Sequence, residues 1–528
     1  MLFLGSISIA WSTLITNRKY TLILIFSIAC LIRIIPELSA YPYPIGYDVI
    51  NSYIPIVTNF KAHLETRWPT ISGQFPLYFL ILHLINIVTG LDSHSTVTIF
   101  AIVMFGIFAI SIFLVGCRLL KISTSHSIFL TFFVILQMAV LRTTWDHHRD
   151  IFALSMMFFT FLLIYKGKKE ENASNDWHHH HITLSIAALI LSALTASADR
   201  MIGALLSLTL LIYVFIAKSK ITILCALVAV SFFAATTILP NHDTSSQANI
   251  GSIITGSSTE PAAPTFYNPT NLLILFAVIN GLLIPTGIIG LKVLKKNNNN
   301  DNSLLKIPLL ITFAASLLGI VFPDIRSLVA DRWIILCGIF LSIFSAYGII
   351  HLVQRLNLNS IHKVTTTTIF SCIIGIFIII GMAYATMPKD NPFILYGIVY
   401  HNIENFAPVT MQLNSIDPRD NAKMISAIAW INNNTEPNAI IVSQKHWRGW
   451  MEIELEDDRR WMDFGFEDDY DAFDSSRNLH SLIKKVASKN DNAYLVTGHT
   501  YILQESGNNP LHMIYFNGKF AIFKIKSH

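Results

Sequence analysis

Long apolar stretches recur along the first three quarters of the chain and are separated by short polar segments. A helix rises 1.5 Å per residue, so about 20 apolar residues cross the roughly 30 Å hydrocarbon core of a bilayer. The pattern therefore predicts about eleven transmembrane helices. The predicted spans are 20–37, 97–117, 126–143, 150–166, 182–198, 201–217, 221–239, 270–291, 304–322, 329–350 and 366–386.

Composition places the chain in the same class. Of its 528 residues, 53% are hydrophobic and only 13% are charged. Such a balance is typical of a polytopic helical membrane protein and excludes an ordinary soluble enzyme. No nucleic acid partner is expected.

Basic residues cluster in alternate loops between the spans, and the positive-inside rule makes those loops and the N-terminus cytoplasmic. The basic positions are Arg18, Lys19, Arg118, Lys121, Lys166–Lys169, Lys218, Lys220, 292–296, Arg355 and Lys363. The alternation holds only if the apolar segment Phe75–Leu91 does not cross the membrane. We expect this segment to lie in the interface, within a first outer loop of about 38–96.

A second domain follows the spans. After residue 387 the hydrophobic runs shorten and carboxylates accumulate. Periodicity predicts helices at 424–432 and 479–487 and strands at 439–442 and 493–496, and Asn517-Gly518 is typical of a hairpin turn. The sequence thus predicts a transmembrane domain over 1–387 and a small extracytoplasmic α/β domain over 388–528. A loop rich in Ser, Thr, Pro and Gly, about 240–269, falls on the same outer side.

Ionisable residues gather at the outer ends of the predicted spans, where charges are costly and usually functional. The first is Asp48, which follows Pro42, Pro44 and Gly46, a segment that cannot continue a helix. Its carboxylate can face a water-filled cavity beside the bilayer. The alternative is a loop aspartate that caps a helix beginning at Val49.

The densest cluster runs from Asp146 to Asp150 and contains His147, His148 and Arg149 as well, with Arg142 just before it. Such a set can coordinate a divalent cation, or it can hold a phosphate through arginine while a carboxylate acts as a base. If the segment is helical, Asp146 and Asp150 share one face. The alternative is a solvated turn whose charges pair with one another.

Two further groups complete the set. Asp199-Arg200 interrupts an otherwise apolar stretch, either as a self-paired turn or as part of the functional cluster. Asp324, Arg326, Asp331 and Arg332 stand between two late spans. There the arginines can grip an anionic phosphate bidentately, or they can simply extend to lipid headgroups.

Taken in order, these landmarks resemble the GT-C superfamily of membrane glycosyltransferases, which includes oligosaccharyltransferase catalytic subunits and protein O-mannosyltransferases. The resemblance implies that Asp48, preceded by Tyr47, is the catalytic aspartate of the first outer loop. It implies that Asp146 and Asp150 belong to a second acidic motif. Glu260 corresponds to the functional glutamate of a flexible outer loop, and Arg326 or Arg332 meets the lipid phosphate.

One departure from oligosaccharyltransferases is plain. Their Trp-Trp-Asp-Tyr-Gly motif is missing, and the chain has Ser443-Gln444-Lys445-His446-Trp447-Arg448-Gly449-Trp450 in the corresponding place. Sequon-directed transfer to asparagine is therefore not expected.

The resemblance implies transfer of a sugar from a polyprenyl-phosphate-linked donor to a glycan, lipid or protein acceptor at the outer face, with inversion at the anomeric carbon. Asp48 would act as the base or orient the acceptor, and Arg149, Arg326 or Arg332 would stabilise the departing phosphate. The cofactor question stays open between a divalent cation, Mg²⁺ or Mn²⁺, and none. Its candidate ligands are Asp48, Asp146, Asp150, His147 and His148.

Two other classes of function remain as alternatives. A transporter or flippase of lipid-linked glycans would also carry charges in a polytopic bundle, although usually near mid-membrane and often within repeats. A non-catalytic membrane scaffold would account for an acidic outer domain but not for the cluster at Asp146–Asp150.

Overall fold

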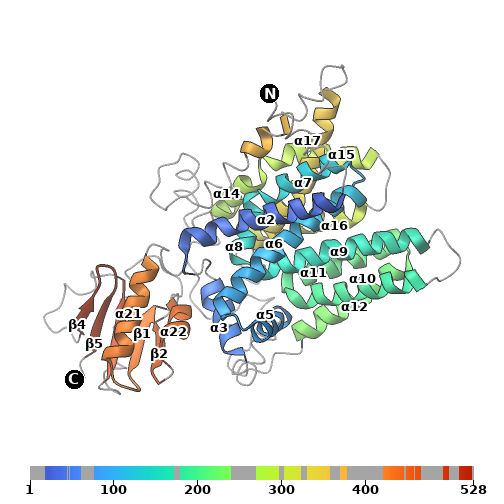
Figure 1. Cartoon of the computed structure of the whole chain (residues 1–528). Helices are drawn as coiled ribbons and strands as arrows, with labels where there is room; N and C mark the ends of the chain where they lie inside the picture. Colours follow the sequence, from blue (N-terminus) through green and yellow to red (C-terminus); the bar gives the residue numbers. More distant parts are fainter. Residues whose placement is uncertain are drawn as a thin grey trace.

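The computed structural model describes residues 18–43, 46, 48–60, 76–171, 179–238, 269–296, 302–322, 330–356, 369–370, 372–376, 420–444, 447–456, 458–464, 492–498 and 511–525. Within them the chain forms a large helical body with a small α/β domain at one end (Figure 1).

Six helices of the described residues are long and apolar enough to cross a membrane. They are α2 (Arg18–Ala40), α6 (Ser93–Arg118), α9 (His148–Glu171), α11 (Arg200–Ala217), α16 (Ser303–Val321) and α17 (Ala330–Leu356). Two bent pairs bring the number to eight. These are α7 (Thr124–Ile135) with α8 (Met138–Asp146), bent by 66°, and α14 (Pro269–Asn280) with α15 (Leu283–Lys296), bent by 60°.

Ten of the eleven predicted spans coincide with these helices, with the two pairs, or with the shorter apolar helices α10 (His179–Ala198) and α12 (Lys220–Ile238). The eleventh, 366–386, is described only at 369–370 and 372–376. The prediction of a polytopic helical protein is confirmed, and the structure adds that two of the predicted spans are broken.

The predicted interfacial segment forms α5 (Pro76–Thr89), a helix of 14 residues. At 1.5 Å per residue it extends about 21 Å, less than the hydrocarbon core. In Figure 1 it is seen nearly end-on, whereas α9, α10 and α12 run across the picture. A helix that is short and transverse to the long helices agrees with a segment that does not cross.

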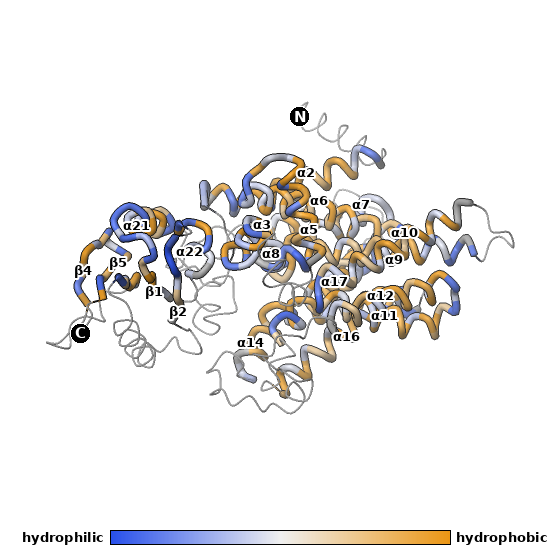
Figure 2. Tube along the Cα trace, turned by 90° about the horizontal axis from the view of Figure 1, so that it is seen from below, coloured by the Kyte–Doolittle hydropathy of each residue, from blue (hydrophilic) through white to orange (hydrophobic). Residues whose placement is uncertain are grey.

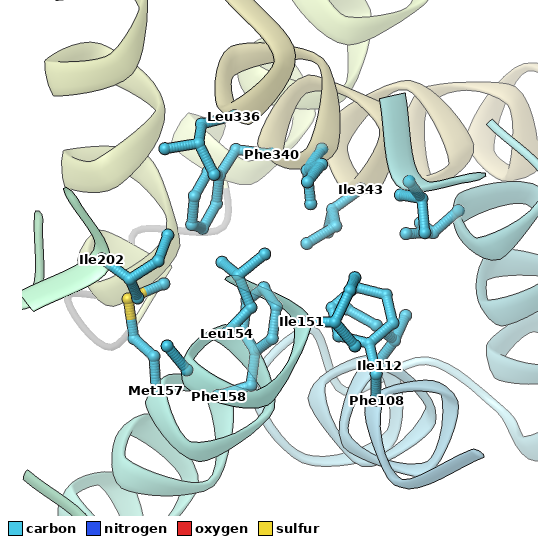
Figure 3. Close-up of a cluster of buried hydrophobic side chains, with 14 of the residues drawn as sticks. Phe108, Ile112, Ile151, Leu154, Met157, Phe158, Ile202, Leu336, Phe340 and Ile343 are labelled. Atoms are coloured by element: carbon cyan, nitrogen blue, oxygen red, sulfur yellow. The ribbon is translucent and has the colours of Figure 1, made fainter. Parts of the chain in front are cut away.

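The hydrophobic core of the helical body lies where α6, α9, α11 and α17 meet. Figure 3 shows side chains from all four helices pointing toward one another. Phe108, Leu154, Ile202 and Phe340 are each fully buried there. In a bilayer the lipid tails are as apolar as these side chains, so van der Waals packing between the helices holds them together. The core therefore fixes the starts of α9 and α17, where the charged residues stand.

The C-terminal domain contains one five-stranded sheet of order β2-β1-β3-β5-β4. The strands are β1 (Ile440–Gln444), β2 (Arg460–Phe464), β3 (Ala493–Thr497), β4 (Leu511–Phe516) and β5 (Ala521–Ile525). Strand β1 pairs in parallel with β2 and β3, and β5 is antiparallel to β3 and β4. The helices α21 (Asn421–Asn434) and α22 (Arg448–Glu454) complete the described part.

The predicted α/β character of this domain is confirmed, since α21, β1, β3 and the β4–β5 hairpin match the predictions. The predicted helix 479–487 and the boundary near residue 388 lie outside the described residues. Strand β2 and helix α22 were not predicted. Figure 2 shows α21 and α22 with hydrophilic stretches along the tube, in contrast to the largely hydrophobic α9 to α12.

Candidate active site

Asp48 stands where an irregular segment gives way to a short helix. Gly46 adopts a φ of 112°, which L side chains rarely adopt, so the turn favours glycine. A five-residue π-helix, η1 (Val49–Tyr53), follows and continues into α3 (Ile54–Thr58). The Asp48 side chain makes no capping hydrogen bond to this helix. The alternative of a purely capping aspartate is therefore wrong.

The carboxylate instead faces residues distant in the sequence. His147 Nδ1 lies 3.2 Å from Asp48 Oδ2, and a carboxylate only accepts, so the imidazole N–H donates this hydrogen bond. The guanidinium of Arg332 lies 3.7 Å from the same oxygen. The Asp48 side chain keeps 23% of its surface exposed, which leaves it accessible to a substrate. Three separate segments thus converge on one partly exposed carboxylate.

His147 reaches Asp48 because the chain turns there. Helix α8 ends at Asp146, His147 adopts φ −102° and ψ 59°, and α9 begins at His148. The expectation that Asp146 and Asp150 share a face of one helix is wrong, since the helix breaks between them. The side chain of Asp146 lies outside the described residues.

A second pair of carboxylates lies behind Asp48. Asp150, in the first turn of α9, and Asp199, the N-cap of α11, are both buried, and each carboxyl acts electrostatically on the other. Asp199 also accepts from the backbone N–H groups of Met201, at 2.8 Å, and Ile202, at 3.1 Å. Two buried carboxyls that act on each other repel when both are ionised, so the pair holds one proton.

The environment of Asp199 decides which carboxyl is ionised. Burial opposes its ionisation, but Arg149, Arg332 and the backbone N–H of Ile202 outweigh burial and lower the pKa of this carboxyl. Asp199 is therefore the anion of the pair.

The cluster as a whole is close to electroneutral. Arg332 interacts electrostatically with Asp48, Asp150, Asp199 and Asp331, while Arg149 interacts with Asp150 and Asp199, and Arg142 with Asp331. With one proton shared, three carboxylate charges face three guanidinium charges. Such mutual pairing offsets the cost of placing charges in a poorly solvated site and holds them in fixed positions.

Arg149 lies on the inner side of this cluster. Its guanidinium is 6.0 Å from the ring centroids of both Tyr53 and Phe79, within the range of cation–π attraction. Arg332, whose side chain is 24% exposed, is the arginine beside Asp48.

His148 turns away from Asp48. Its Nε2 accepts from Arg33 at 3.2 Å, and its ring packs 5.4 Å from that of Tyr53. Arg33 is fully buried in α2, donates to the carbonyl oxygen of Thr144 at 3.1 Å and pairs with Glu37 at 2.7 Å. It therefore ties the first span to the end of α8.

The structure brings together many of the sequence-predicted site residues and leaves others undescribed. Asp48, His147, Arg149, Asp150 and Arg332 form one cluster. The side chain of Asp146 and all of Tyr47, Glu260 and Arg326 lie outside the described residues.

Sequence reasoning left Asp199 open between a turn and the functional cluster, gave Asp331 no role of its own, and did not single out Arg33. An aspartate directly before an apolar helix is an N-cap signal, and it would have located Asp199 at the start of α11. An arginine inside an apolar span is a functional signal, and it would have drawn attention to Arg33.

The cluster offers few ligands to a divalent cation. Among the described residues, no group of three or more His, Cys, Asp or Glu side chains is arranged to hold a metal ion. Asp48 and His147 would supply two ligands, but Arg332 already neutralises that carboxylate, and His148 faces Arg33. Hard cations such as Mg²⁺ take about six oxygen ligands. The described side chains therefore supply too few ligands to hold a resident metal ion.

The arrangement of the helices is that of a GT-C-like fold, as the sequence predicts. It is similar to ArnT from Cupriavidus metallidurans bound to undecaprenyl phosphate, with a TM-score of 0.56 and 10% identity over 96% of this chain and 98% of that chain. It is also similar to the archaeal oligosaccharyltransferase AglB from Archaeoglobus fulgidus, in complex with an inhibitory peptide and a dolichol-phosphate. There the TM-score is 0.51, with 12% identity over 91% of this chain and 69% of that chain.

These likenesses are structural. The sequence matches no protein-family model, and a comparison with curated proteins finds no match. What the structural neighbours share with this chain is the arrangement of helices, over nearly its whole length.

Proposed function

We propose that this protein is a membrane glycosyltransferase that moves a sugar from a polyprenyl-phosphate-linked donor to an acceptor hydroxyl. The observation that carries the proposal is the partly exposed Asp48 carboxylate, held by His147 and Arg332 at 3.2 Å and 3.7 Å. The GT-C-like fold supports it, because two structural neighbours hold undecaprenyl phosphate and dolichol-phosphate.

In the proposed reaction the acceptor oxygen attacks the anomeric carbon while the bond from that carbon to the phosphate oxygen breaks. The acceptor proton passes to Asp48, and the lipid phosphate leaves with the electron pair. His147 and Arg332 hold the carboxylate in place, and Arg332 is also the exposed cation near the developing phosphate charge. A single displacement inverts the anomeric configuration.

The sidedness of the membrane supports a lipid-linked donor. We infer from the basic loops that the N-terminus is cytoplasmic and that Asp48 and the C-terminal domain lie outside the cytoplasm. Cytoplasmic nucleotide sugars do not reach such a site. The transfer experiment identifies the sugar and the acceptor, which is a glycan, a lipid or a protein.

The test measures transfer of labelled sugar from polyprenyl-phosphate donors by the full chain in lipid nanodiscs. Asp48→Asn keeps the shape of the side chain and removes its charge. We expect kcat to fall by a factor of about 10²–10⁴, the usual contribution of a general base. The measurement is repeated with a chelator. If the wild type then loses transfer, a divalent cation is a cofactor, and Asp48, Asp146 and His147 are its candidate ligands.

The matched control is Asp92→Asn. Asp92 is an aspartate outside the cluster that accepts from the Ser95 backbone N–H at 2.9 Å as the N-cap of α6, a role that asparagine also fills. Its variant should transfer sugar like the wild type. A well-folded wild type that transfers nothing across varied donors and acceptors would overturn the proposal in favour of transport or a scaffold.

A further inference from the structure

The C-terminal domain touches the segment that carries Asp48. Helix α22 packs against η1 and α3 in the structure, and Figure 1 shows it beside α3 at the end of the helical body. The backbone N–H of Gly449 donates to Asn51 Oδ1 at 2.8 Å, across 398 residues of sequence. Because Asn51 lies three residues after Asp48, this contact fixes the backbone that bears the carboxylate.

The approach at Gly449 is closer than any side chain permits. A Cβ atom on Gly449 would meet the carbonyl oxygen of Ile50 at 2.0 Å and the Cα of Asn51 at 2.8 Å. Real Cβ atoms do not approach backbone so closely, and a backbone carbonyl cannot rotate out of the way as a flexible side chain does. Glycine at this position is thus what lets α22 lie directly on η1.

The contact is also apolar. The side chain of Ile50 is fully buried, and it belongs to the core of the C-terminal domain, with Trp450, Met451 and Ile428, not to the core of the helical body. Tyr43, before Asp48, meets the ring of Trp450 edge-on at 6.4 Å. The domain therefore holds the chain on both sides of Asp48.

This geometry also accounts for the segment that replaces the oligosaccharyltransferase motif. Trp447 and Trp450 are 3% and 1% exposed, so their rings are packed and are not offered to an acceptor. A π-helix is rare and is frequently found at functional sites, and α22 packs directly against η1.

We infer that α22 is a clamp that sets the position of Asp48, with Gly449 and Asn51 as its positioning residues. The inference rests on the proposed function, since it assigns the clamp to the residue expected to accept the proton. Both residues act through Asp48 and neither touches the reacting atoms.

The test uses the full chain in lipid nanodiscs with Gly449→Ala and Asn51→Ala. Two quantities are measured: amide hydrogen exchange over residues 49–58, and kcat with the donor KM. We expect faster exchange and a fall in kcat of about tenfold to a hundredfold, because small displacements of a reacting group are costly. The donor KM should change by less than about twofold, since donor-binding groups are unmoved.

Two controls make the result specific. Asn51→Asp keeps an oxygen that accepts from Gly449, so it should restore most of kcat. Gly498→Ala is the same substitution in the same domain, and its Cβ would meet the Trp447 ring at 3.4 Å and the Phe520 ring at 3.8 Å, both ordinary contacts. It should leave exchange over residues 49–58 and kcat at wild-type values.

The double variant decides whether the clamp works through Asp48. In an Asp48→Asn background, Gly449→Ala should cause no further loss of kcat, because the group it positions is already disabled. An equal further loss would overturn the inference, as would wild-type kcat in Gly449→Ala. A wild type without transfer overturns the proposed function. In that case amide hydrogen exchange over residues 49–58 tests the clamp independently of transfer. Faster exchange in Gly449→Ala supports the clamp, and unchanged exchange overturns it.

Discussion

Asp150 and Asp199 are two buried aspartates with different surroundings. Asp199 is ionised because Arg149, Arg332 and the start of α11 stabilise its charge. Asp150 Oδ1, in contrast, is buried and has no hydrogen-bond partner among the described residues. An amide resembles a protonated carboxyl in shape and in its ability to donate, but it cannot replace a carboxylate charge.

The two substitutions should therefore differ. We expect Asp150→Asn to lower the free energy of unfolding by about 1 kcal/mol or less, as for a shape-conserving change of a neutral partner. Asp199→Asn should lower it by about 3 kcal/mol, because it leaves two buried arginines without this anion. Denaturant titration in bicelles measures both. Equal losses would contradict the assignment of the proton.

At low pH the loss of stability caused by Asp199→Asn should disappear. Because the pKa of Asp199 is lowered in the folded chain, its stabilising contribution is complete above the ordinary aspartate pKa, about 3.9, and is lost as the pH falls through the folded value. The stability difference between wild type and Asp199→Asn should thus shrink below about pH 4. Asp92→Asn, at an exposed position, should change the stability by much less at every pH.

The sequence predicts which individual residues belong to the candidate site, but it does not predict which residues they contact. Charges are few in a chain of this class, so Asp48, His147 and Arg332 stood out individually. Their convergence, and the links from Asp150 to Asp199 and from Arg33 to His148, depend on how helices face one another. No spacing along one chain encodes those contacts.

Among the helices, α17 is the element on which the site most depends, because it begins beside Asp331 and Arg332 and packs against α15 and α16. Its crossing with α15 is made by two glycines. A Cβ on Gly348 would meet the carbonyl oxygen of Thr286 at 2.0 Å, and one on Gly290 would meet that of Phe344 at 2.0 Å. Small residues permit this backbone contact, as they do in other membrane helices.

Gly348→Ala should lower the free energy of unfolding by about 1–3 kcal/mol, the usual cost of overpacking, because α15 and α17 must separate. The control is Gly375→Ala, since no atom lies within 4 Å of the Cβ it would add. The same bicelle titration measures both variants. Equal stability of Gly348→Ala and Gly375→Ala would show that α15 and α17 can separate at no cost in free energy.

Apolar length was enough to predict the helices and could not predict their breaks. The bend between α7 and α8 falls at Leu136 and Gln137, where neither proline nor glycine marks it. Helix α22 and strand β2 are short and lie among charged residues, so their periodicity is weak. Tertiary contacts, with η1 and with β1, define them.

The molecule as a whole is polarised. The C-terminal domain lies beside the Asp48 segment at one end of the helical body, and the basic end of α9, with Lys168 and Lys169, lies toward the other (Figure 1). This polarity is what the positive-inside rule requires of a protein whose basic loops stay in the cytoplasm.

Cysteine labelling would check the orientation. Cys372 is the exposed native cysteine, so it is first replaced by serine. In intact cells an impermeant maleimide should react with His512→Cys, on exposed β4, and should reach Lys169→Cys only after permeabilisation. The reverse pattern would place the Asp48 side in the cytoplasm and remove the case for a lipid-linked donor.

The buried Arg33 has a consequence for how the chain is made. Its acceptors, the Thr144 carbonyl and His148, lie 111 and 115 residues later, so α2 leaves the ribosome long before they exist. Before Thr144 and His148 are synthesised, Glu37, one helical turn away, is the one of these three residues that can pair with Arg33. Entry of the first helix into the bilayer and its final seating are therefore separate events, and the second waits for α8 and the start of α9.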